Sequence, residues 1–172
     1  MTRSEADQPE ACMQEFYYKK VEDDTFCLTG YKGREAEVVI PTDKVVTILN
    51  DKVFRGHSEI TSICIPDTVT DIGEFVFDGC SNLRQLRLPS NLKTLWGLSF
   101  VRCGIEEIVL PDSLRIIPPF AFKDCKNLRR VVCGAGLEKI YSWAFGGCDL
   151  LTKENFIHGP DVDISPKAFE RL

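Results

Sequence analysis

Residues 65–83 read Ile-Pro-Asp-Thr-Val-Thr-Asp-Ile-Gly-Glu-Phe-Val-Phe-Asp-Gly-Cys-Ser-Asn-Leu, and versions of this stretch recur along the chain. The recurrence is clearest at one phenylalanine in each copy, which returns after 23, 23, 22, 23 and 24 residues. These phenylalanines, called the Phe column below, are Phe54, Phe77, Phe100, Phe122, Phe145 and Phe169. Self-similarity at this period predicts a solenoid, in which each coil stacks in register on its neighbours.

Each full repeat opens with apolar residues at alternate positions, as in Ile63 and Ile65 or Leu86 and Leu88. Alternation over so few residues predicts a short strand with one buried face. Proline then ends the strand in most copies, because it cannot donate to a strand ladder. A second apolar pair follows, and then a small residue precedes the phenylalanine. Three residues after the phenylalanine come the residues called the cysteine column below: Cys80, Cys103, Cys125 and Cys148, with His57 in the equivalent place of the first copy.

The motifs resemble a known repeat family. Residues 83–92, Leu-Arg-Gln-Leu-Arg-Leu-Pro-Ser-Asn-Leu, nearly reproduce the leucine-rich-repeat consensus, and residues 65–83 look like its BspA-type subclass. Residues 26–41 resemble the entry module that often precedes such repeats. The resemblance, over about residues 26–172, implies a right-handed α/β or mainly-β superhelix with short parallel strands and an irregular β-rich N-terminal cap. Members of that family are mostly known as binding and surface modules, and the resemblance supplies no catalytic residues.

We expect three parts along the chain. Residues 1–15 form a flexible acidic arm, and residues 16–59 form an N-terminal cap and partial first repeat. Strands are expected in the cap at Tyr17–Lys19, Thr25–Thr29 and Ala36–Ile40. Residues 60–172 hold the leucine-rich repeats, of which the last, 151–172, is degenerate. A degenerate terminal repeat is typical of a polar cap; the alternative is an open end that pairs with another chain.

Composition excludes several classes of function. With 172 residues and 44% apolar content, the chain can build one domain with a continuous core. A net charge of −5 argues against general nucleic-acid binding, which needs a basic surface. No apolar run is long enough for a membrane span, and residues 1–10 lack the apolar segment of a secretory signal. We therefore expect a cytoplasmic protein if the chain is complete, and a cell-surface or secreted one if a leader or anchor was removed.

The eight cysteines invite a disulfide or zinc interpretation. Side chains in one repeat column all point the same way, whereas a disulfide needs a dihedral near 90° and zinc needs ligands that converge. We interpret the cysteine column as buried packing groups, and Cys64, on the open face of its strand, as the reactive thiol. The two histidines, His57 and His158, fall in distant coils, and no nucleophile or phosphate-binding motif occurs. We expect no enzyme, no cofactor and no metal site.

The open face of the predicted sheet is the first candidate binding surface. Its central contacts are predicted to be Gln85, Arg87, Glu107 and Arg130. A flanking column of Arg84, Glu106 and Arg129 alternates in charge, so its members can also pair with one another, at no more than about 1 kcal/mol per exposed pair. The alternative is therefore a self-neutralised, solvated face.

A second candidate surface lies two residues before each phenylalanine, at Phe75, Leu98, Phe120 and Trp143. If these side chains point outward, they form a hydrophobic stripe with Trp143 as its anchor. The alternative is that they lie flat and seal the edge of the coil.

These observations favour a non-enzymatic module that binds a protein partner through its sheet face. The partner itself cannot be named from the sequence, and a monomer is the favoured oligomeric state. Two alternatives stay open. One is a cell-surface or secreted adhesion fragment that binds host matrix; the other is a structural repeat unit that self-assembles through the end formed by residues 151–172.

Overall fold

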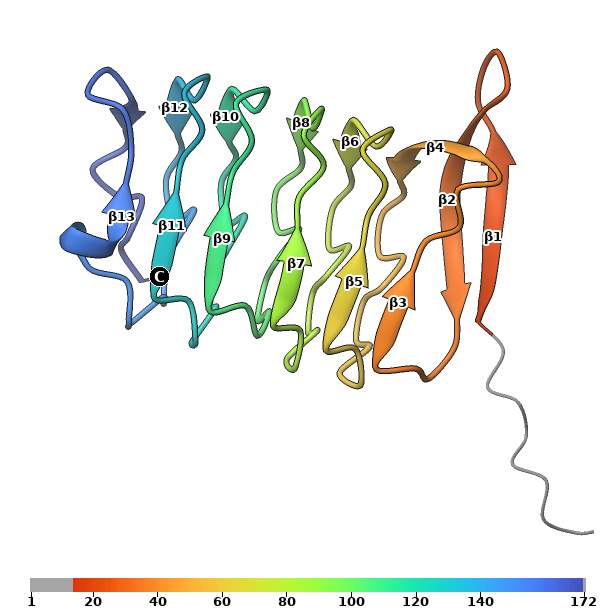
Figure 1. Cartoon of the computed structure of the whole chain (residues 1–172). Coiled ribbons are helices and arrows are strands. Elements are labelled where there is room, and N and C mark those ends of the chain that lie inside the picture. The colour runs from red at the N-terminus through yellow and green to blue at the C-terminus, as the bar shows by residue number, and fades with distance from the viewer. Residues whose placement is uncertain (1–13, 172) are drawn as a thin grey trace, which may run out of the picture.

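The computed structural model of the chain describes residues 14–171, which wind into a β-solenoid of about six turns (Figure 1). The predicted mainly-β solenoid is confirmed, and the one helical element in the described chain is a single 3-10 turn, η1 (Lys153–Asn155). The arm expected at residues 1–15 lies outside the described residues except for Gln14 and Glu15.

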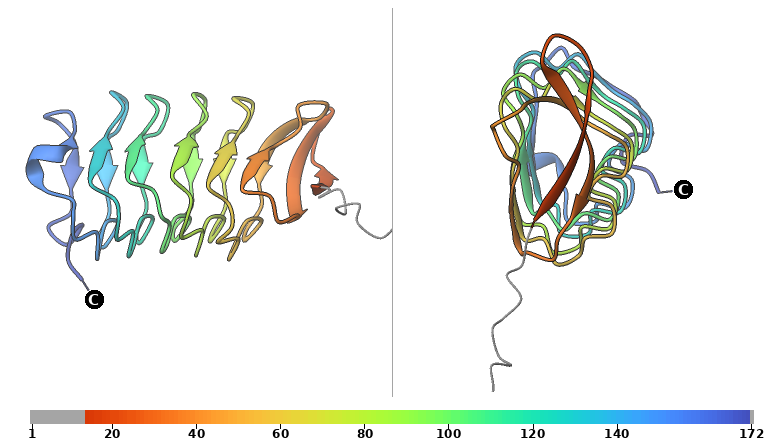
Figure 2. Two further views of the ribbon diagram at one scale, coloured as in Figure 1. Left: turned by 60° about the horizontal axis from the view of Figure 1, so that its bottom comes forward. Right: turned by 90° about the vertical axis from the view of Figure 1, so that its right-hand side faces the viewer.

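The N-terminal end is closed by a hairpin. Strand β1 (Glu15–Lys20) pairs antiparallel with β2 (Thr25–Lys32), which in turn pairs parallel with β4 (Val45–Leu49). Viewed along the solenoid, the hairpin crosses the first coils (Figure 2). The two predicted strands in this hairpin are confirmed and are longer than expected. This cap shields the first rung, whose apolar side chains and backbone would otherwise be uncovered.

Each coil contributes one strand to a front sheet and one to a second sheet. The front strands are β3 (Glu37–Val39), β5 (Ser62–Cys64), β7 (Gln85–Arg87), β9 (Glu107–Val109), β11 (Arg130–Val132) and β13 (Phe156–Ile157). The second-sheet strands after β4 are β6 (Asp71–Ile72), β8 (Thr94–Leu95), β10 (Ile116–Ile117), β12 (Lys139–Ile140) and β14 (Asp163–Ile164). Pairing between successive coils is parallel and in register; β5 aligns with β7, for example, from Ser62 opposite Gln85 to Cys64 opposite Arg87.

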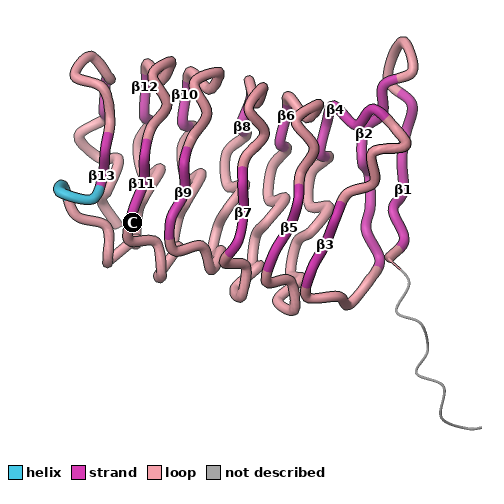
Figure 3. The backbone as a smooth tube through the Cα atoms, in the orientation of Figure 1, coloured by secondary structure: helices cyan, strands magenta, loops and turns pink. Residues whose placement is uncertain are grey.

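Both sheets are divided at the same place. The front sheet splits into β3-β5-β7 and β9-β11-β13, and the second sheet splits between β8 and β10 (Figure 3). The split falls where the repeat shortens to 22 residues, because Cys103 and Ile105 are separated by one residue where Cys80 and Leu83 are separated by two. The turn side stays continuous there, since the Phe100 amide donates to the Ala121 carbonyl at 2.8 Å.

The Phe column forms a continuous stack through the core. Successive ring centroids lie 5.0 to 5.7 Å apart, with interplanar angles of 2° to 16°. Tyr31 covers the N-terminal ring, with its centroid 5.3 Å from that of Phe54. The last ring, Phe169, is 44% exposed. The stack confirms that residues one repeat apart in sequence are neighbours in space.

The cysteine column is buried, as predicted, and has a use beyond packing. The thiols of Cys80, Cys125 and Cys148 donate to the carbonyls of Phe54, Phe100 and Phe122, one coil earlier, at 3.1, 2.9 and 3.1 Å. Burial raises the pKa of the Cys103 thiol to about 12 and that of half-buried Cys133 to about 12. The seven cysteines in the described chain are free thiols, and Cys64 is exposed as expected.

In every coil except the last, two turns use the left-handed backbone region. The first lies two residues before the phenylalanine, where Phe75, Leu98, Phe120 and Trp143 have φ of 56°, 63°, 60° and 59°. The second lies two residues after it, where three coils have glycine (Gly56, Gly79 and Gly147) and two have Arg102 and Asp124, at φ of 53° and 58°. Non-glycine residues in this region are strained by about 1–2 kcal/mol, so the burial or pairing of their side chains has to offset that cost.

A buried carboxylate crosslinks three coils. Asp78 is 1% exposed and accepts from Arg55 Nε at 2.9 Å and from Arg102 Nη2 at 2.6 Å. Arg55 and Arg102 come from the coils on either side, and both guanidinium groups remain about half exposed. Most other coils have glycine at the position of Arg102. The ion pair with Asp78 thus offsets the cost of the left-handed backbone at Arg102.

Candidate binding face

The front sheet presents the predicted contact residues together. Gln85 and Arg87 project outward from β7, Glu107 from β9 and Arg130 from β11, and all four are exposed. They are held in place by strands whose intervening residues face the core: Ile108 and Val131 are buried in it, and Leu86 is partly buried and packs against it. The sequence therefore predicted the geometry of this strip correctly, while the binding role of these residues stays a prediction.

The strip consists of two parallel columns of different character. The polar column contains Glu37, Ser62 and Gln85, which are in register on one side of the division, and Glu107 and Arg130, which are in register on the other. The second column contains Val39, Cys64, Arg87, Val109 and Val132. Val39 and Val109 are 61% and 66% exposed, so the second column is an apolar line interrupted by one guanidinium. Exposed aliphatic side chains aligned on a rigid sheet are typical of a contact surface.

A shallow hollow of about 470 Å³ lies over β3, β5 and β7. Its rim includes Arg87, whose guanidinium makes a two-pronged contact with both carboxylate oxygens of Asp67, at 3.2 and 3.1 Å. Hydrogen bonds from Arg87 and from the Ser90 amide lower the pKa of the Asp67 carboxyl. Asp67 thus accepts a hydrogen bond from the backbone of the next coil and also orients Arg87 beside the hollow.

The charged side chains of the flanking column are paired with other groups of the chain. Arg84 Nε lies 3.5 Å from Glu106, and Arg129 Nη2 lies 3.1 Å from the same carboxylate. Arg84 also donates to the carbonyls of Ser81 and Gly104, which lie beside the division between β7 and β9. These contacts support the self-neutralising interpretation for Arg84, Glu106 and Arg129. Their groups are already satisfied within the chain.

The side chains of the central strip have fewer partners within the chain. Within residues 14–171, neither Arg130 nor Gln85 has a side-chain ion pair or hydrogen bond. Glu107 contacts Arg129 at 3.7 Å. Arg130 is therefore the cation of the front sheet that can take a new acidic partner without losing an existing one.

Trp143 does not belong to this strip. It follows β12 on the turn side of its coil, is half-buried, and stacks on Phe120 with centroids 5.3 Å apart and an interplanar angle of 7°. Lys167 Nζ lies 5.7 Å from the Trp143 ring centroid. Phe75 and Leu98 are half-buried in the same column. The structure thus favours the alternative in which this column seals the edge of the coil.

Sequence reasoning missed a different exposed aromatic group on the second sheet. Trp96 is 53% exposed, and Tyr141 and Ile116 are also exposed beside Pro118. Trp96, Pro118 and Tyr141 each lie four residues before a member of the Phe column. This shared repeat position could have revealed the group in the sequence. The earlier coils, however, have no apolar residue at that position.

No group of three His, Cys, Asp or Glu side chains that could hold a metal ion occurs in the described part of the chain. The same residues contain no helix of the length and apolar character needed to cross a bilayer.

Comparison with known families agrees with the repeat geometry. The family described as BspA type leucine rich repeat region matches residues 47–172 in six copies. The chain belongs to the BspA-type leucine-rich repeat family. The predicted resemblance is thereby confirmed for most of the chain, and the match begins within β4, at the transition from cap to repeats. A search of curated proteins gave no match.

Solved structures of bacterial leucine-rich repeat proteins share the fold. A leucine-rich repeat protein from Treponema pallidum superposes with a TM-score of 0.72 at 26% identity, covering 92% of this chain and 85% of that one. One from Bacteroides ovatus gives 0.64 at 23% identity, covering 94% of this chain and 51% of the other. A leucine-rich cell surface protein from Faecalibacterium prausnitzii gives 0.54 at 21%, covering 86% and 54%. This BspA-type chain therefore spans about half the length of the latter two proteins.

Proposed function

We propose that this BspA-type repeat protein is a non-enzymatic module that captures a protein partner on its front sheet, over the columns centred on Arg87, Val109 and Arg130. The observation that supports this proposal is the exposed apolar column beside an unpaired arginine, on strands fixed by a continuous core. Membership of a repeat family built for protein interaction supports it at a coarser level.

The expected partner surface has an apolar centre and acidic groups. Val39 and Val109 would pack against apolar side chains, while Arg130 would donate hydrogen bonds to a carboxylate of the partner. Arg87 would contribute its remaining donors without leaving Asp67, which already orients it. Because the strands hold these groups before binding, little side-chain and backbone freedom is lost on association.

The proposal predicts that the double variant Arg87→Ala/Arg130→Ala weakens partner capture by at least about tenfold, because truncated hot-spot side chains cost more than 1 kcal/mol of binding energy. Thermal stability should hardly change, since both side chains are exposed and surface ion pairs contribute little to folding. Capture from host lysate, quantified by mass spectrometry, and a thermal melt of each protein would measure the two effects.

Arg115→Ala/Lys139→Ala provides the matched control. These two cations lie on the second sheet and also form exposed ion pairs, with Glu138 at 3.0 Å and Asp163 at 2.8 Å. The control should bind as the unchanged protein does. An equal loss of capture in both double variants would show a general charge effect, and a parallel loss of thermal stability would show that the strip is scaffold only.

A further inference from the structure

Both sheets lose their pairing at one junction between coils. The six coils, numbered from the N-terminus, comprise residues 36–59, 60–82, 83–104, 105–127, 128–150 and 151–171. Between the fourth and fifth coils, the amides of Arg129 and Arg130 donate to the Glu106 carbonyl, at 2.8 and 3.2 Å. Within residues 14–171, the equivalent amides of Glu106 and Glu107 donate to no carbonyl of the third coil. The front sheet is therefore open between the third and fourth coils.

The second sheet is interrupted at the same junction by a proline. The Trp96 amide, directly after β8, donates to the Ile72 carbonyl one coil earlier at 3.0 Å. The Tyr141 amide, directly after β12, donates to the Ile117 carbonyl in the same way at 3.0 Å. The fourth coil has Pro118 at this position, and proline has no amide hydrogen to donate. A hollow of about 290 Å³, lined by residues of both β8 and β10, lies here.

The first three coils form one body. Strands β3, β5 and β7 are paired in the front sheet, and β4, β6 and β8 are paired in the second sheet. The buried carboxylate of Asp78, in the second coil, adds ion pairs to Arg55 of the first coil and Arg102 of the third. Neither ion pair reaches the fourth coil.

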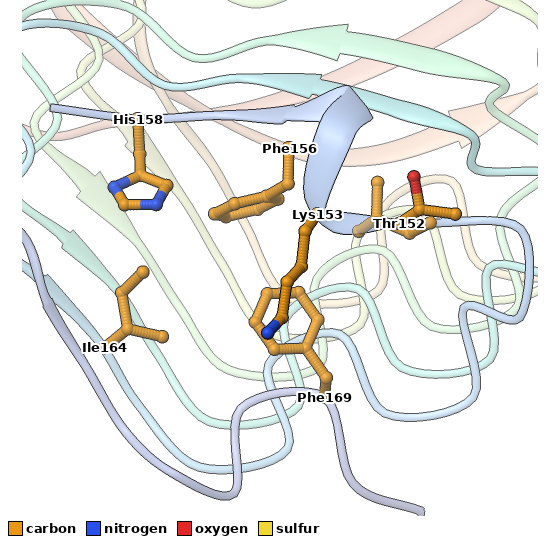
Figure 4. Close-up of a pocket in the computed structure, with 7 residues that line it drawn as sticks. Thr152, Lys153, Phe156, His158, Ile164 and Phe169 are labelled. Carbon is orange, nitrogen blue, oxygen red and sulfur yellow. The ribbon is translucent and has the colours of Figure 1, made fainter.

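The last three coils form a second body of the same design. Strands β9, β11 and β13 are paired in the front sheet, and β10, β12 and β14 in the second. Asp149 of the fifth coil lies 3.5 Å from Lys126 Nζ of the fourth and accepts from Arg171 Nε of the sixth at 3.1 Å. In the sixth coil, Phe169 stacks on Phe145 at a centroid distance of 5.6 Å, beside a pocket of about 490 Å³ at the C-terminal end (Figure 4).

The two bodies are joined on the turn side. There the Phe100 amide donates to the Ala121 carbonyl at 2.8 Å, and the Arg102 amide donates to the Lys123 carbonyl at 2.9 Å. The rings of Phe100 and Phe122 lie 5.0 Å apart across the junction. Backbone hydrogen bonds and stacked rings keep this side closed, so it can act as a pivot.

The sheet sides of the junction are spanned by side chains. The Ser113 hydroxyl lies 2.8 Å from the Ser90 carbonyl and 2.7 Å from the Leu92 carbonyl. Arg84 Nε lies 3.5 Å from the Glu106 carboxylate. Contacts of this kind break and re-form without unwinding a strand, whereas paired strands open as a cooperative unit. The junction is therefore weakest where the two sheets are divided.

We propose that this junction is a hinge, about which the last three coils move as one body relative to the first three. A few residues at the ends of elements absorb such a motion while the packed bodies on either side stay rigid. Because the hinge lies between β7 and β9, its motion changes the separation of Arg87 and Val109. That consequence for partner capture rests on the proposed function, whereas the motion itself does not.

NMR relaxation dispersion of the backbone amides tests the hinge in the full, unliganded chain, because collective hinge motions fall on the microsecond-to-millisecond timescale. Glu107 and Ile116, beside the junction, should show dispersion. Arg130 and Lys139, their paired equivalents one coil later, should give flat profiles. Flat profiles at Glu107 and Ile116, or dispersion of equal size at both junctions, would overturn the proposal.

Pro118→Ala should partly close the hinge, because it supplies the amide that Trp96 and Tyr141 use in their coils. One added backbone hydrogen bond should lower the open population, and with it the dispersion at Ile116, by about fivefold. Pro111→Ala, in the same coil but outside the second sheet, is the matched control and should leave the dispersion unchanged. An unchanged profile in folded Pro118→Ala, or an equal decrease in both variants, would contradict the hinge.

A covalent lock gives a second test that needs no change at Pro118. In a Cys12→Ser/Cys64→Ser background, a short bifunctional maleimide joining Gln85→Cys to Glu107→Cys should abolish the dispersion at Ile116. The same bridge between Glu107→Cys and Arg130→Cys, within the second body, should leave it intact. Dispersion that survives the first bridge, or is lost equally with the second, would also overturn the proposal. All of these measurements use the free chain, so a failure of partner capture does not affect them.

Discussion

Replacing Phe100 by alanine should lower the free energy of unfolding by about 4 kcal/mol, within the range for emptying a fully buried phenylalanine site. Phe100 is fully buried, and its ring lies 5.0 Å from both Phe77 and Phe122. The loss combines a cavity in the middle of the core with two broken ring contacts, each worth about 0.5–1.5 kcal/mol beyond burial. Urea unfolding followed by circular dichroism would measure it.

Phe169→Ala is the control for this prediction, because the same ring at the end of the stack is partly exposed. Its loss of unfolding free energy should be less than half that of Phe100→Ala. Similar losses at the two positions would contradict the view that the Phe column acts as a continuous stack closed at its interior positions and open at its end.

Asp78→Ala should cost about 2–3 kcal/mol of unfolding free energy, through the loss of charge-assisted hydrogen bonds from Arg55 and Arg102. The cost stays below the value for a fully buried ion pair, because both guanidinium groups are about half exposed and can be rehydrated. Arg102 would then retain its left-handed backbone without the ion pair that offsets it. Chemical denaturation of Asp78→Ala and Asp78→Asn would measure the effect, with the asparagine variant less affected.

Asp67→Ala is the comparison for Asp78, since Asp67 also meets an arginine through two hydrogen bonds but lies at the surface. Its effect on stability should be much smaller than that of Asp78→Ala. If the two aspartates prove equivalent, burial of Asp78 between coils is not what gives its ion pairs their importance.

The fold was predictable because the residues that repeat with its period are the ones that fill the core. The Phe and cysteine columns, the alternating aliphatic residues and the closing prolines each repeat at one position, so the register of the coils follows from counting. The second sheet was not predicted. Its strands after β4 are two residues long, too short for an alternating pattern to appear.

The contact strip was predictable only in part. Outward positions on a strand follow from alternation, which placed Gln85, Arg87, Glu107 and Arg130 correctly on one face. The sequence does not show which charged side chains already have partners within the chain. Arg84 donates to backbone carbonyls beside the division of the front sheet. That division follows the 22-residue repeat, and the loss of strand pairing there depends on three-dimensional geometry that the spacing alone does not give.

The sequence also did not show which polar side chains are buried and which aromatic side chains are exposed. Asp78 has the appearance of an exposed turn residue, because the same position in other coils is Arg55, Val101 or Lys123. Trp143 was expected to be a possible anchor, yet its left-handed backbone turns it against Phe120, and Trp96 is the tryptophan that faces solvent. Both differences arise from side-chain direction, which depends on backbone geometry that no spacing rule describes.

The claim that the front sheet is the binding face can be tested most directly at Cys64, an exposed thiol on β5 inside the hollow. In a Cys12→Ser background, a bulky maleimide attached to Cys64 should abolish partner capture from host lysate. The same label on Lys93→Cys, an exposed second-sheet position, in a Cys12→Ser/Cys64→Ser background should leave capture intact. Capture that survives the label at Cys64, or that is lost equally with the label at position 93, would contradict the account.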